Sequence, residues 1–351
     1  MATFVGNSNA EIQQGIILGM GNPLLDISSE VGDELLSKYD VKLNNAILAE
    51  EKHIPIYAEL ESNFQVDYIA GGATQNSIRV ANWMLGVPHA TSFMGCIGND
   101  EHGKTLTEAA EKDGVQTHYM ISQEQPTGTC AVLIKGGERS LVANLAAANF
   151  FTPDHMETDK AKELLNSSKI VYIAGFFLTV SLDTILSVGN HCVDNNKIFC
   201  MNLSAPFIVQ FFGDQLAAAM MYCDFVFGNE SEAEAFGESK EWGKDIPTIA
   251  KKISALPKAS GTHPRVVVIT QGSTSTVVAV GGKVLEFPVE PLSSDQLVDT
   301  NGAGDAFVGG FLSQLAKGKA LEECVAAGHW ASRVIIQRSG CTFPEVCEYS
   351  A

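Results

Sequence analysis

Short runs of apolar, β-branched residues alternate with helical patterns along most of the chain, and this feature constrains the fold most strongly. The runs are residues 15–22, 90–98, 169–177, 197–204, 224–229 and 265–270. The helical patterns include residues 74–86, 104–113, 181–193, 246–256 and 320–337. Runs that are apolar at nearly every position are typical of parallel strands buried on both faces. The sequence therefore predicts an α/β fold with a doubly wound, mostly parallel sheet, which binds ligands beyond the carboxyl ends of its strands.

Two segments depart from this alternation. Residues 24–70 are more polar and irregular, and residues 124–148 have the pattern of a β-hairpin that turns at Gly136 and Gly137. We expect both segments to form one small β-rich lid. The predicted division is a large α/β domain of residues 1–23, 71–123 and 149–351, and a lid domain of residues 24–70 and 124–148.

The second strand of the predicted hairpin carries one arginine beside apolar residues. Arg139, Leu141 and Ala143 share one face of this strand, because the side chains of a strand alternate between its two faces. On an exposed strand this pattern is ordinary. On a lid that closes over a site, it would bring a positive charge and an apolar ceiling to the ligand together.

Composition narrows the range of partners. Of the 351 residues, 45% are apolar and 18% are charged, which favours a packed core over disorder. The net charge of −18 argues against nucleic acid as a partner, because the surface repels phosphate polymers. A bound phosphate group would therefore need a local, concentrated set of donors.

The sequence also indicates a reducing compartment. Its N-terminal stretch, MATFVGNSNAEIQQ, lacks the basic start and apolar block of a secretory signal, and no apolar stretch approaches the ~20 residues that span a bilayer. The eight cysteines form no C-x-x-C pair and the eight histidines no H-x-x-x-H pair. We expect reduced thiols, no zinc site, and a cytoplasmic protein that is a monomer.

The stretch VDTNGAGDAF, residues 298–307, predicts a helix start that can bind an anion. Leu297 and Val298 are strand-like, and the apolar residues after Asp305 have the one-sided spacing of a helix. A helix N-terminus binds anions through its unpaired backbone N–H groups. The donors offered here are the amides of Asn301, Gly302, Ala303 and Gly304. Asp305 lies in the first turn, where it either favours the helix dipole or acts as a general base that takes a hydroxyl proton.

A second cluster of polar residues lies near the start of the chain. Asn22 and Asp26 follow the first predicted strand, and Gly71, Gly72 and Asn76 precede the next helix. Asn and Asp side chains beside bare glycine backbone can accept hydrogen bonds from vicinal hydroxyl groups. The alternative is that the asparagines cap helices and that the glycines form turns.

Taken together, these motifs resemble the ribokinase-like family of sugar and nucleoside kinases over essentially the whole chain. The segments that carry the resemblance are GGATQNSIRVA, GTCAVLI, ERSLVANLAAAN, AGFFLTVS and DTNGAGDAFVGGFL. The DTNGAGD segment is specific for the family, whereas the first and third segments point to its nucleoside branch. Ala73 departs from the pattern, since many such kinases have serine there. A backbone contact at this position would survive the change, and a hydroxyl contact would be lost.

The resemblance implies transfer of a phosphoryl group from ATP, with Mg²⁺, to the 5′-hydroxyl of adenosine. It makes Asp305 the catalytic base, Asn301–Gly304 the anion hole and Arg139 the lid cation. It makes Asn22, Asp26, Gly71, Gly72 and Asn76 the ribose-binding set, with Ala73 next to it. The implied apolar pocket for the purine consists of Leu24, Leu48, Cys130, Leu141, Ala143, Phe177 and Phe207.

The same resemblance places the second substrate. Asn229 and Glu232 match the N-x-x-E pattern near Mg²⁺ and the phosphates, with Glu232 as the residue nearest the metal. Thr270, Gly272, Ser273 and His329 fall where ATP would lie, although His329 could equally be a packed helical histidine. Two alternatives stay open, namely a related kinase for another nucleoside or a sugar, and a non-catalytic family member that only binds a nucleoside.

Overall fold

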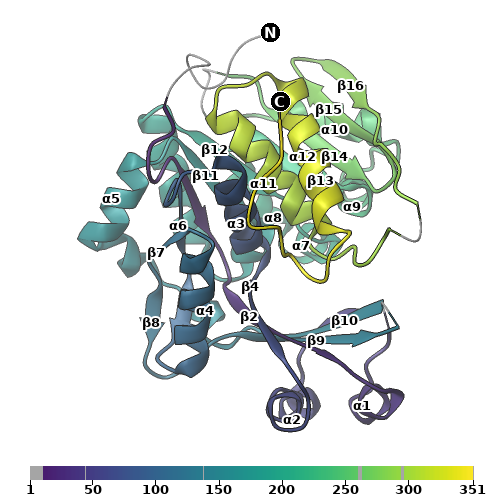
Figure 1. Ribbon diagram of the computed structural model, residues 1–351. Helices are drawn as coiled ribbons and strands as arrows, with labels where there is room; N and C mark the ends of the chain where they lie inside the picture. The colour runs from purple at the N-terminus through teal and green to yellow at the C-terminus, as the bar shows by residue number, and fades with distance from the viewer. Residues whose placement is uncertain (1–10, 44, 137, 260–262, 294–295, 351) are drawn as a thin grey trace.

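The computed structural model describes residues 11–43, 45–136, 138–259, 263–293 and 296–350. Within these residues, the backbone forms a large sheet of nine strands with helices on both faces, and a separate sheet of five strands (Figure 1). The prediction of an α/β fold with a mostly parallel sheet and a small β-rich lid is confirmed. No helix in the described part of the chain is long and apolar enough to cross a membrane.

The large sheet is parallel from β14 to β7 and ends in two antiparallel strands. Its order is β16 (Lys283–Phe287), β15 (Thr274–Val280), β14 (Val266–Gln271), β13 (Phe225–Asn229), β12 (Ile198–Asn202), β11 (Ile170–Ala174), β1 (Ile17–Met20), β5 (Thr91–Met94) and β7 (Gln116–Thr117). One predicted strand, residues 90–98, is in fact two. Its second half, β6 (Cys96–Gly98), pairs with β8 (Met120–Ser122) in a sheet of its own.

Helices cover both faces of the large sheet because its strands are apolar on both faces. In β1, Leu18 and Met20 belong to one core and Ile17 to the other. The first core is closed by α5 (Asp159–Ser167), α6 (Leu182–Asp194), α8 (Gly213–Met220), α9 (Glu230–Ser239) and α10 (Ile246–Ser254). The second is closed by α3 (Ala73–Leu85), α4 (Glu101–Lys112), α11 (Ala303–Ala316) and α12 (Leu321–Ile335).

The predicted strand before α11 is wrong. Leu297 and Val298 lie in an irregular segment and are 46% and 44% exposed, so their apolar side chains do not mark a buried strand. The amide of Val298 instead donates to the carbonyl of Ile336, beyond the end of α12. This segment carries the chain back from the antiparallel edge of the sheet to the start of α11.

The small sheet is mixed and has helices on one face. Its order is β3 (Ala46–Leu48), β10 (Glu138–Asn144), β9 (Thr129–Lys135), β2 (Leu24–Glu30) and β4 (Asp67–Gly71). Helices α1 (Asp33–Lys38) and α2 (Pro55–Asn63) pack on the face formed by Ile27, Leu133 and Val142. Residues 24–70 are therefore less irregular than their polar composition indicates. The turn of the hairpin contains Gly136 with φ +59°, whereas Gly137 lies outside the described residues.

The chain passes between the large and the small sheet four times. The four connecting segments lie in two pairs, and the backbones within each pair are in contact. Gly72, between β4 and α3, has φ +94°, and a Cβ atom there would lie 2.3 Å from the carbonyl oxygen of Asn22, which links β1 to β2. Gly128, just before β9, approaches Leu145, just after β10, so closely that a Cβ atom would lie 2.6 Å from its carbonyl oxygen. The two sheets are thus joined at two compact crossings.

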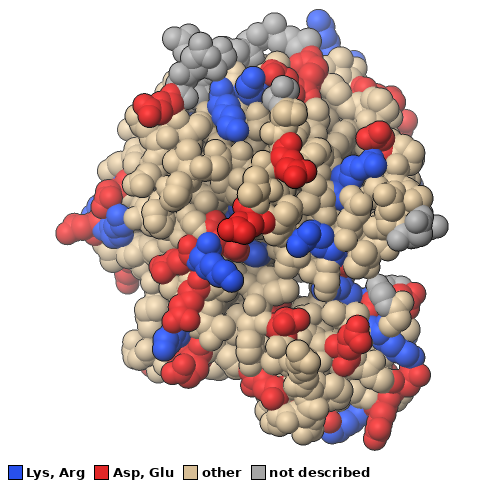
Figure 2. Space-filling model, in the orientation of Figure 1, with Lys and Arg blue, Asp and Glu red and all other residues tan. Residues whose placement is uncertain are grey.

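The charged side chains that are visible on one face of the molecule are of both signs. Figure 2 shows acidic and basic side chains interspersed there, without a continuous basic patch. That nucleic acid is not a partner stays a prediction from the net charge of −18.

Candidate active site

Beyond the carboxyl ends of the strands lies a cavity of about 520 Å³. It lies where β12, β13 and β14 end and where α11 begins, which is the position that the fold predicts for a ligand. Its lining includes eight of the residues named from the sequence: Ala73, Asn229, Glu232, Thr270, Asn301, Gly302, Gly304 and Asp305.

Helix α11 is preceded by Gly302, a position that only glycine fits. Gly302 has φ +79°, in the left-handed region, and its Cα faces Cys341 so closely that a Cβ atom would lie 3.2 Å from the cysteine Cβ. Two of the four predicted donors are already used, since the amide of Asn301 donates to Asp299 Oδ1 (2.9 Å) and that of Ala303 to the carbonyl of Thr300 (3.2 Å). Within the described residues, the amides of Gly302 and Gly304 have no acceptor, so these two are the donors available to an anion.

Asp305 lies next to these amides in the first turn of α11. Its Oδ2 accepts a hydrogen bond from Asn76 Nδ2 (3.0 Å). Burial raises the pKa of Asp305 to about 7, and the hydrogen bond from Asn76 opposes this rise. A carboxyl group with a pKa near 7 is suited to accept a proton from a hydroxyl group at neutral pH.

A second carboxyl group, Asp26, lies on β2 with its oxygens packed against bare backbone. A Cβ atom on Gly71 would lie 2.3 Å from Asp26 Oδ1, so only glycine leaves room for this carboxylate. Burial raises the pKa of Asp26 to about 7, while the guanidinium groups of Arg79 and Arg139 oppose the rise and Asp305 adds to it. The two carboxyl groups are therefore close enough to interact.

Asn22, where β1 leads into β2, has a buried side-chain oxygen, Oδ1, without a hydrogen-bond donor in the described part of the protein. A buried acceptor without a partner costs about 1–3 kcal/mol, so such an atom indicates a ligand group. Asn76 differs, because its amide is engaged at both ends, by Arg79 Nη1 (3.1 Å) and by Asp305. Of the predicted ribose set, Asn22 and Asp26 thus retain acceptors, whereas Asn76 holds the predicted base.

The apolar residues predicted to form a purine pocket divide into two groups. Leu24, Cys130, Leu141 and Ala143 come together in one cluster on the face of the small sheet opposite α1 and α2. Leu48, on the edge strand β3, is 60% exposed. The cluster agrees with an apolar ceiling, and its contact with a base stays a prediction.

Two phenylalanines of the predicted pocket are placed differently. Phe177 is fully buried in the core, edge-on to Phe151, and the structure does not place it on the cavity. Its neighbour Phe176 lines the cavity and packs against Phe207, with ring centroids 6.0 Å apart. The aromatic rings that line the cavity are therefore those of Phe176, Phe227 and Phe307, whereas Phe207 is linked to it only through Phe176, and Phe177 is not linked to it at all.

Arg139 is buried at the junction of the two sheets and is already paired. Its Nε lies 3.0 Å from Asp299 Oδ2, and both side chains are almost fully buried. It also donates to Ser339 Oγ, and the same Asp299 oxygen accepts from the amide of Gly340 (3.0 Å). The lid strand β10 is thus tied to the segment that precedes the glycine amides.

Asn229 and Glu232 form a reciprocal cap at the start of α9. Asn229 Oδ1 accepts from the amide of Glu232 (3.0 Å), and Glu232 Oε2 accepts from the amide of Asn229 (2.9 Å). Glu232 is 5% exposed yet lines the cavity, and burial raises its pKa to about 7. Three or more His, Cys, Asp or Glu residues do not converge on a cation site anywhere in the described ranges.

The residues predicted to contact ATP are only partly brought together. Thr270, at the end of β14, lines the cavity. Gly272 and Ser273 form the exposed turn between β14 and β15, away from the cavity lining. His329 bonds Thr276 Oγ1 through Nε2 (2.8 Å) and packs on Phe307, as a packed helical histidine would.

Sequence reasoning missed several residues of the site. Asn202, Ser204 and Thr300 line the cavity. Asn202 ends β12 and Ser204 follows it, which was a usable signal, whereas Thr300 lies in the irregular segment before α11. Asp299 and Arg79 are engaged close to the predicted base, and neither is part of a motif whose chemistry names it. The only hint of Arg79 was an arginine one helical turn after Gln75 and Asn76.

Comparisons with known proteins agree with this fold and site. Residues 33–346 match the model of the pfkB family carbohydrate kinases. The chain is 58% identical to adenosine kinase 2 of Arabidopsis thaliana over 337 residues, which is 96% of this chain and 98% of that protein. The chain belongs to the pfkB family of carbohydrate kinases. Within this family it falls in the adenosine kinase group, which it matches along nearly its whole length.

Solved structures show the same similarity. The Anopheles gambiae adenosine kinase in complex with P1,P4-di(adenosine-5) tetraphosphate is 49% identical, with a TM-score of 0.89 over 96% of this chain and 100% of that chain. The Schistosoma mansoni adenosine kinase in complex with adenosine and AMP is 37% identical, with a TM-score of 0.87 over 96% of this chain and 100% of that chain. The expectation of a ribokinase-like kinase from the nucleoside branch is therefore confirmed.

Proposed function

We propose that the protein phosphorylates adenosine to AMP with ATP as donor, and that the cavity residues described above carry this reaction. The adenosine kinase activity follows from the family. The observations that support the residue roles are the buried, unpartnered Asn22 Oδ1, the interaction of Asp26 with the carboxyl base Asp305, and the two open amides beside that base. A kinase for a hydroxylated substrate requires these two halves, hydroxyl acceptors and an anion hole.

In the proposed reaction, the 5′-oxygen of adenosine forms a bond to the γ-phosphorus of ATP while the bond from that phosphorus to the β,γ-bridging oxygen breaks. Asp305 accepts the proton of the 5′-hydroxyl, and ADP carries away the bonding electrons of the broken bond. The amides of Gly302 and Gly304 donate to the oxygens of the transferred group as negative charge develops on it. Arg139 would add a positive charge once it leaves Asp299.

Mg²⁺ is part of the proposal, and Glu232 and Asn229 are the residues that would hold it through water. The donor set fits, since Mg²⁺ in kinase sites is held by one or two carboxylates together with substrate phosphates. Glu232 lines the cavity, and its burial raises its pKa to about 7. A bound ion would supply charge neutralisation between the two terminal phosphates.

The small sheet is proposed to act as a lid, with the domain division given above. Its apolar cluster of Leu24, Cys130, Leu141 and Ala143 would cover the purine while Asp26, on the neighbouring strand, binds the ribose. The eight free cysteines fit the proposed cytoplasmic location, and a monomer is proposed for the active form.

Substrate choice tests the proposed function. The experiment is an assay of ADP formation with ATP, Mg²⁺ and a panel of adenosine, other nucleosides and free sugars. The proposal expects adenosine to give the highest kcat/KM. A higher kcat/KM for another nucleoside or a sugar would favour the related-kinase alternative, and nucleoside binding without ADP formation would indicate a non-catalytic member.

The ribose contacts predict a sharp loss of affinity on removal of one carboxylate. Asp26→Ala is expected to weaken adenosine binding, because a carboxylate can accept hydrogen bonds from both ribose hydroxyls. For the same reason, 2′-deoxyadenosine should be a poorer substrate by about 1–3 kcal/mol in kcat/KM, which is the cost of leaving a polar group unpaired. Equal kcat/KM for the two nucleosides in the wild type would exclude this role of Asp26.

A charge placed in the apolar cluster of Leu24, Cys130, Leu141 and Ala143 should weaken the binding of the base. Leu141→Asp is expected to raise the adenosine Kd, because it places a carboxylate against an apolar base. Ile47→Asp is the control, since Ile47 lies on β3, beside β10, and packs on the opposite face of the small sheet. Calorimetry of both variants would separate contact with the base from general damage to the sheet. An unchanged Kd in Leu141→Asp would remove Leu141 from the site.

A further inference from the structure

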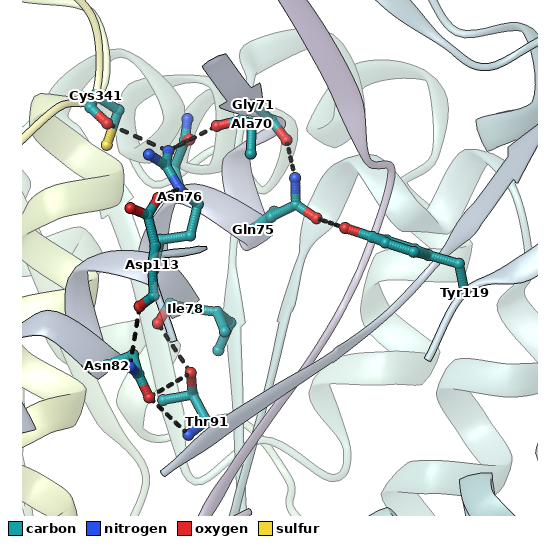
Figure 3. Close-up of polar contacts among 11 residues, drawn as sticks. Ala70, Gly71, Gln75, Asn76, Ile78, Asn82, Thr91, Asp113, Tyr119 and Cys341 are labelled. Atoms are coloured by element: carbon teal, nitrogen blue, oxygen red, sulfur yellow. Dashed lines mark hydrogen bonds and ion pairs between the residues drawn. The ribbon is translucent and has the colours of Figure 1, made fainter. Parts of the chain in front are cut away.

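Arg79 on α3 is a buried cation to which the reaction above gives no role. It is 4% exposed, and its Nε donates to Asp113 Oδ2 (2.6 Å). Its Nη1 lies within hydrogen-bond distance of the carbonyl oxygens of Ala70 (2.6 Å) and Cys341 (3.2 Å) and of Asn76 Oδ1 (3.1 Å). Figure 3 shows these acceptors converging from β4, α3, the end of α4 and the C-terminal segment.

One of these contacts leads directly to the predicted base. Asn76 accepts from Arg79 with its oxygen and donates from its nitrogen to Asp305 Oδ2 (3.0 Å). A side-chain amide can present either end, and the guanidinium accepts no hydrogen bond, so Arg79 fixes which end faces Asp305. Asn76 can therefore hold the Asp305 carboxylate only in the orientation that Arg79 sets.

The other contacts fix backbone on both sides of the cavity. Ala70 precedes Gly71, against which the Asp26 carboxylate packs, and Cys341 packs on Gly302 at the start of α11. Phe343, two residues beyond Cys341, lies over the guanidinium at 5.5 Å. A single side chain thus joins the wall under the ribose site, the helix that carries Asn76 and the segment behind the glycine amides.

We propose that Arg79 is a positioning residue for phosphoryl transfer, which acts through Asn76 on the Asp305 carboxylate. This proposal rests on the role of Asp305 given under the proposed function. Arg79 touches neither the cavity lining nor a reacting atom, so positioning should show in kcat rather than in the affinity for adenosine. Because the Arg79 charge also opposes the rise in the pKa of Asp26, the variants are compared well above pH 7, where Asp26 stays ionised.

The chain offers a matched control in Arg265. It is also almost fully buried, at 2% exposure, and donates to the backbone carbonyls of Cys223, Ile253, Leu256 and Pro257, remote from the cavity lining. Arg265→Gln therefore measures what the loss of a buried, fully bonded guanidinium does to folding alone. Comparison with Arg79→Gln separates positioning from stability.

The test is a double-mutant cycle on the full chain, with kcat, adenosine KM and thermal unfolding measured for each variant. Arg79→Gln is expected to lower kcat about 10- to 100-fold, as a small misplacement of a reacting group does, with KM changed less than about 3-fold. Arg79→Lys should recover part of kcat, because it keeps the charge but loses the planar fork. Arg265→Gln should lower the Tm to a similar degree and leave kcat within about 2-fold of wild type.

The cycle with Asn76→Ala decides the route. If Arg79 acts through Asn76, Arg79→Gln should cost less than about 3-fold in kcat once Asn76 is absent, because contacting residues on one route are non-additive. An equal fold-loss of kcat in both backgrounds would overturn the proposal, as would wild-type kcat in a folded Arg79→Gln. If that variant does not fold, Asp113→Ala, which removes the acceptor of Arg79 Nε outside the cavity, replaces it with the same criteria. If the wild-type protein did not phosphorylate adenosine at all, the proposed function itself would be refuted.

Discussion

Asp305→Asn is expected to lower kcat by about 10²–10⁴-fold while the adenosine Kd stays close to that of the wild type, because a general base contributes in this range. The substitution keeps the shape of the side chain, and the asparagine oxygen can still accept the hydrogen bond from Asn76 that the structure shows. Steady-state kinetics and calorimetry on the same preparation would check both halves of the expectation. Lost adenosine binding with a matching rise in KM alone would show that Asp305 is a ligand rather than the base.

The pH dependence of the reaction follows from the same group. Asp305 works as a base only when ionised, and burial raises its pKa to about 7, so activity should fall as the pH drops through this value. Asp26 is also raised to about 7 and interacts with Asp305, so the acid limb of kcat/KM belongs to the pair. The fall of kcat itself at low pH is assigned to Asp305. The residual kcat of Asp305→Asn should therefore no longer fall as the pH drops through about 7.

Arg139→Ala is expected to have the second largest effect, and the effect has two parts. A cation that neutralises the transferred group in the transition state is worth about 10²–10³-fold in kcat. The structure adds a stability cost, because the partner Asp299 would stay buried without its counter-charge, which typically costs about 3–5 kcal/mol. Kinetics and denaturant unfolding would measure the two parts separately.

Two further measurements make the Arg139 result specific. Arg139→Lys keeps the charge and should retain more of kcat than alanine does. Hydrogen exchange of residues 129–144 with and without adenosine would report whether the lid strands become protected when the site is filled. Wild-type kcat in Arg139→Ala together with unchanged exchange would leave a rigid hairpin with a structural arginine as the better explanation.

The parts of the fold that were predictable are those fixed by local pattern. Strands buried on both faces and the helix after Asp305 follow from the spacing of apolar residues, and the glycine at 302 follows from the backbone conformation that a helix start needs there. Helix α1 was not found, because six residues give too short a pattern to distinguish from a loop. The antiparallel edge strands were missed because β15 begins with Thr-Ser-Thr before its apolar run and β16 has no fully buried residue.

The parts of the site that sequence could not give depend on tertiary contacts. Phe176 and Phe177 exchange roles because a 3₁₀ turn, Gly175–Thr179, follows β11 directly, so the alternation of the strand no longer tells which ring faces the cavity. Asp299 looks like one more residue of the DTNGAGD segment until Arg139 is found beside it. The sequence predicts Asn76 as a ribose ligand because it does not show that Asn76 bonds Asp305, 229 residues away, and Arg79, three residues away.

The two compact crossings between the sheets have a mechanical consequence. Gly72 touches Asn22, and Gly128 touches Leu145, each through backbone, so a swing of the small sheet that preserves both contacts has one axis, the line through them. Asn22 lies on that axis and would hardly shift, whereas the tip of the hairpin would sweep the widest arc. The ribose end of the substrate would then be held at the pivot, whereas Arg139, three residues after Gly136 of the hairpin turn, would travel with the far end of the small sheet, so each opening would have to break its ion pair with Asp299.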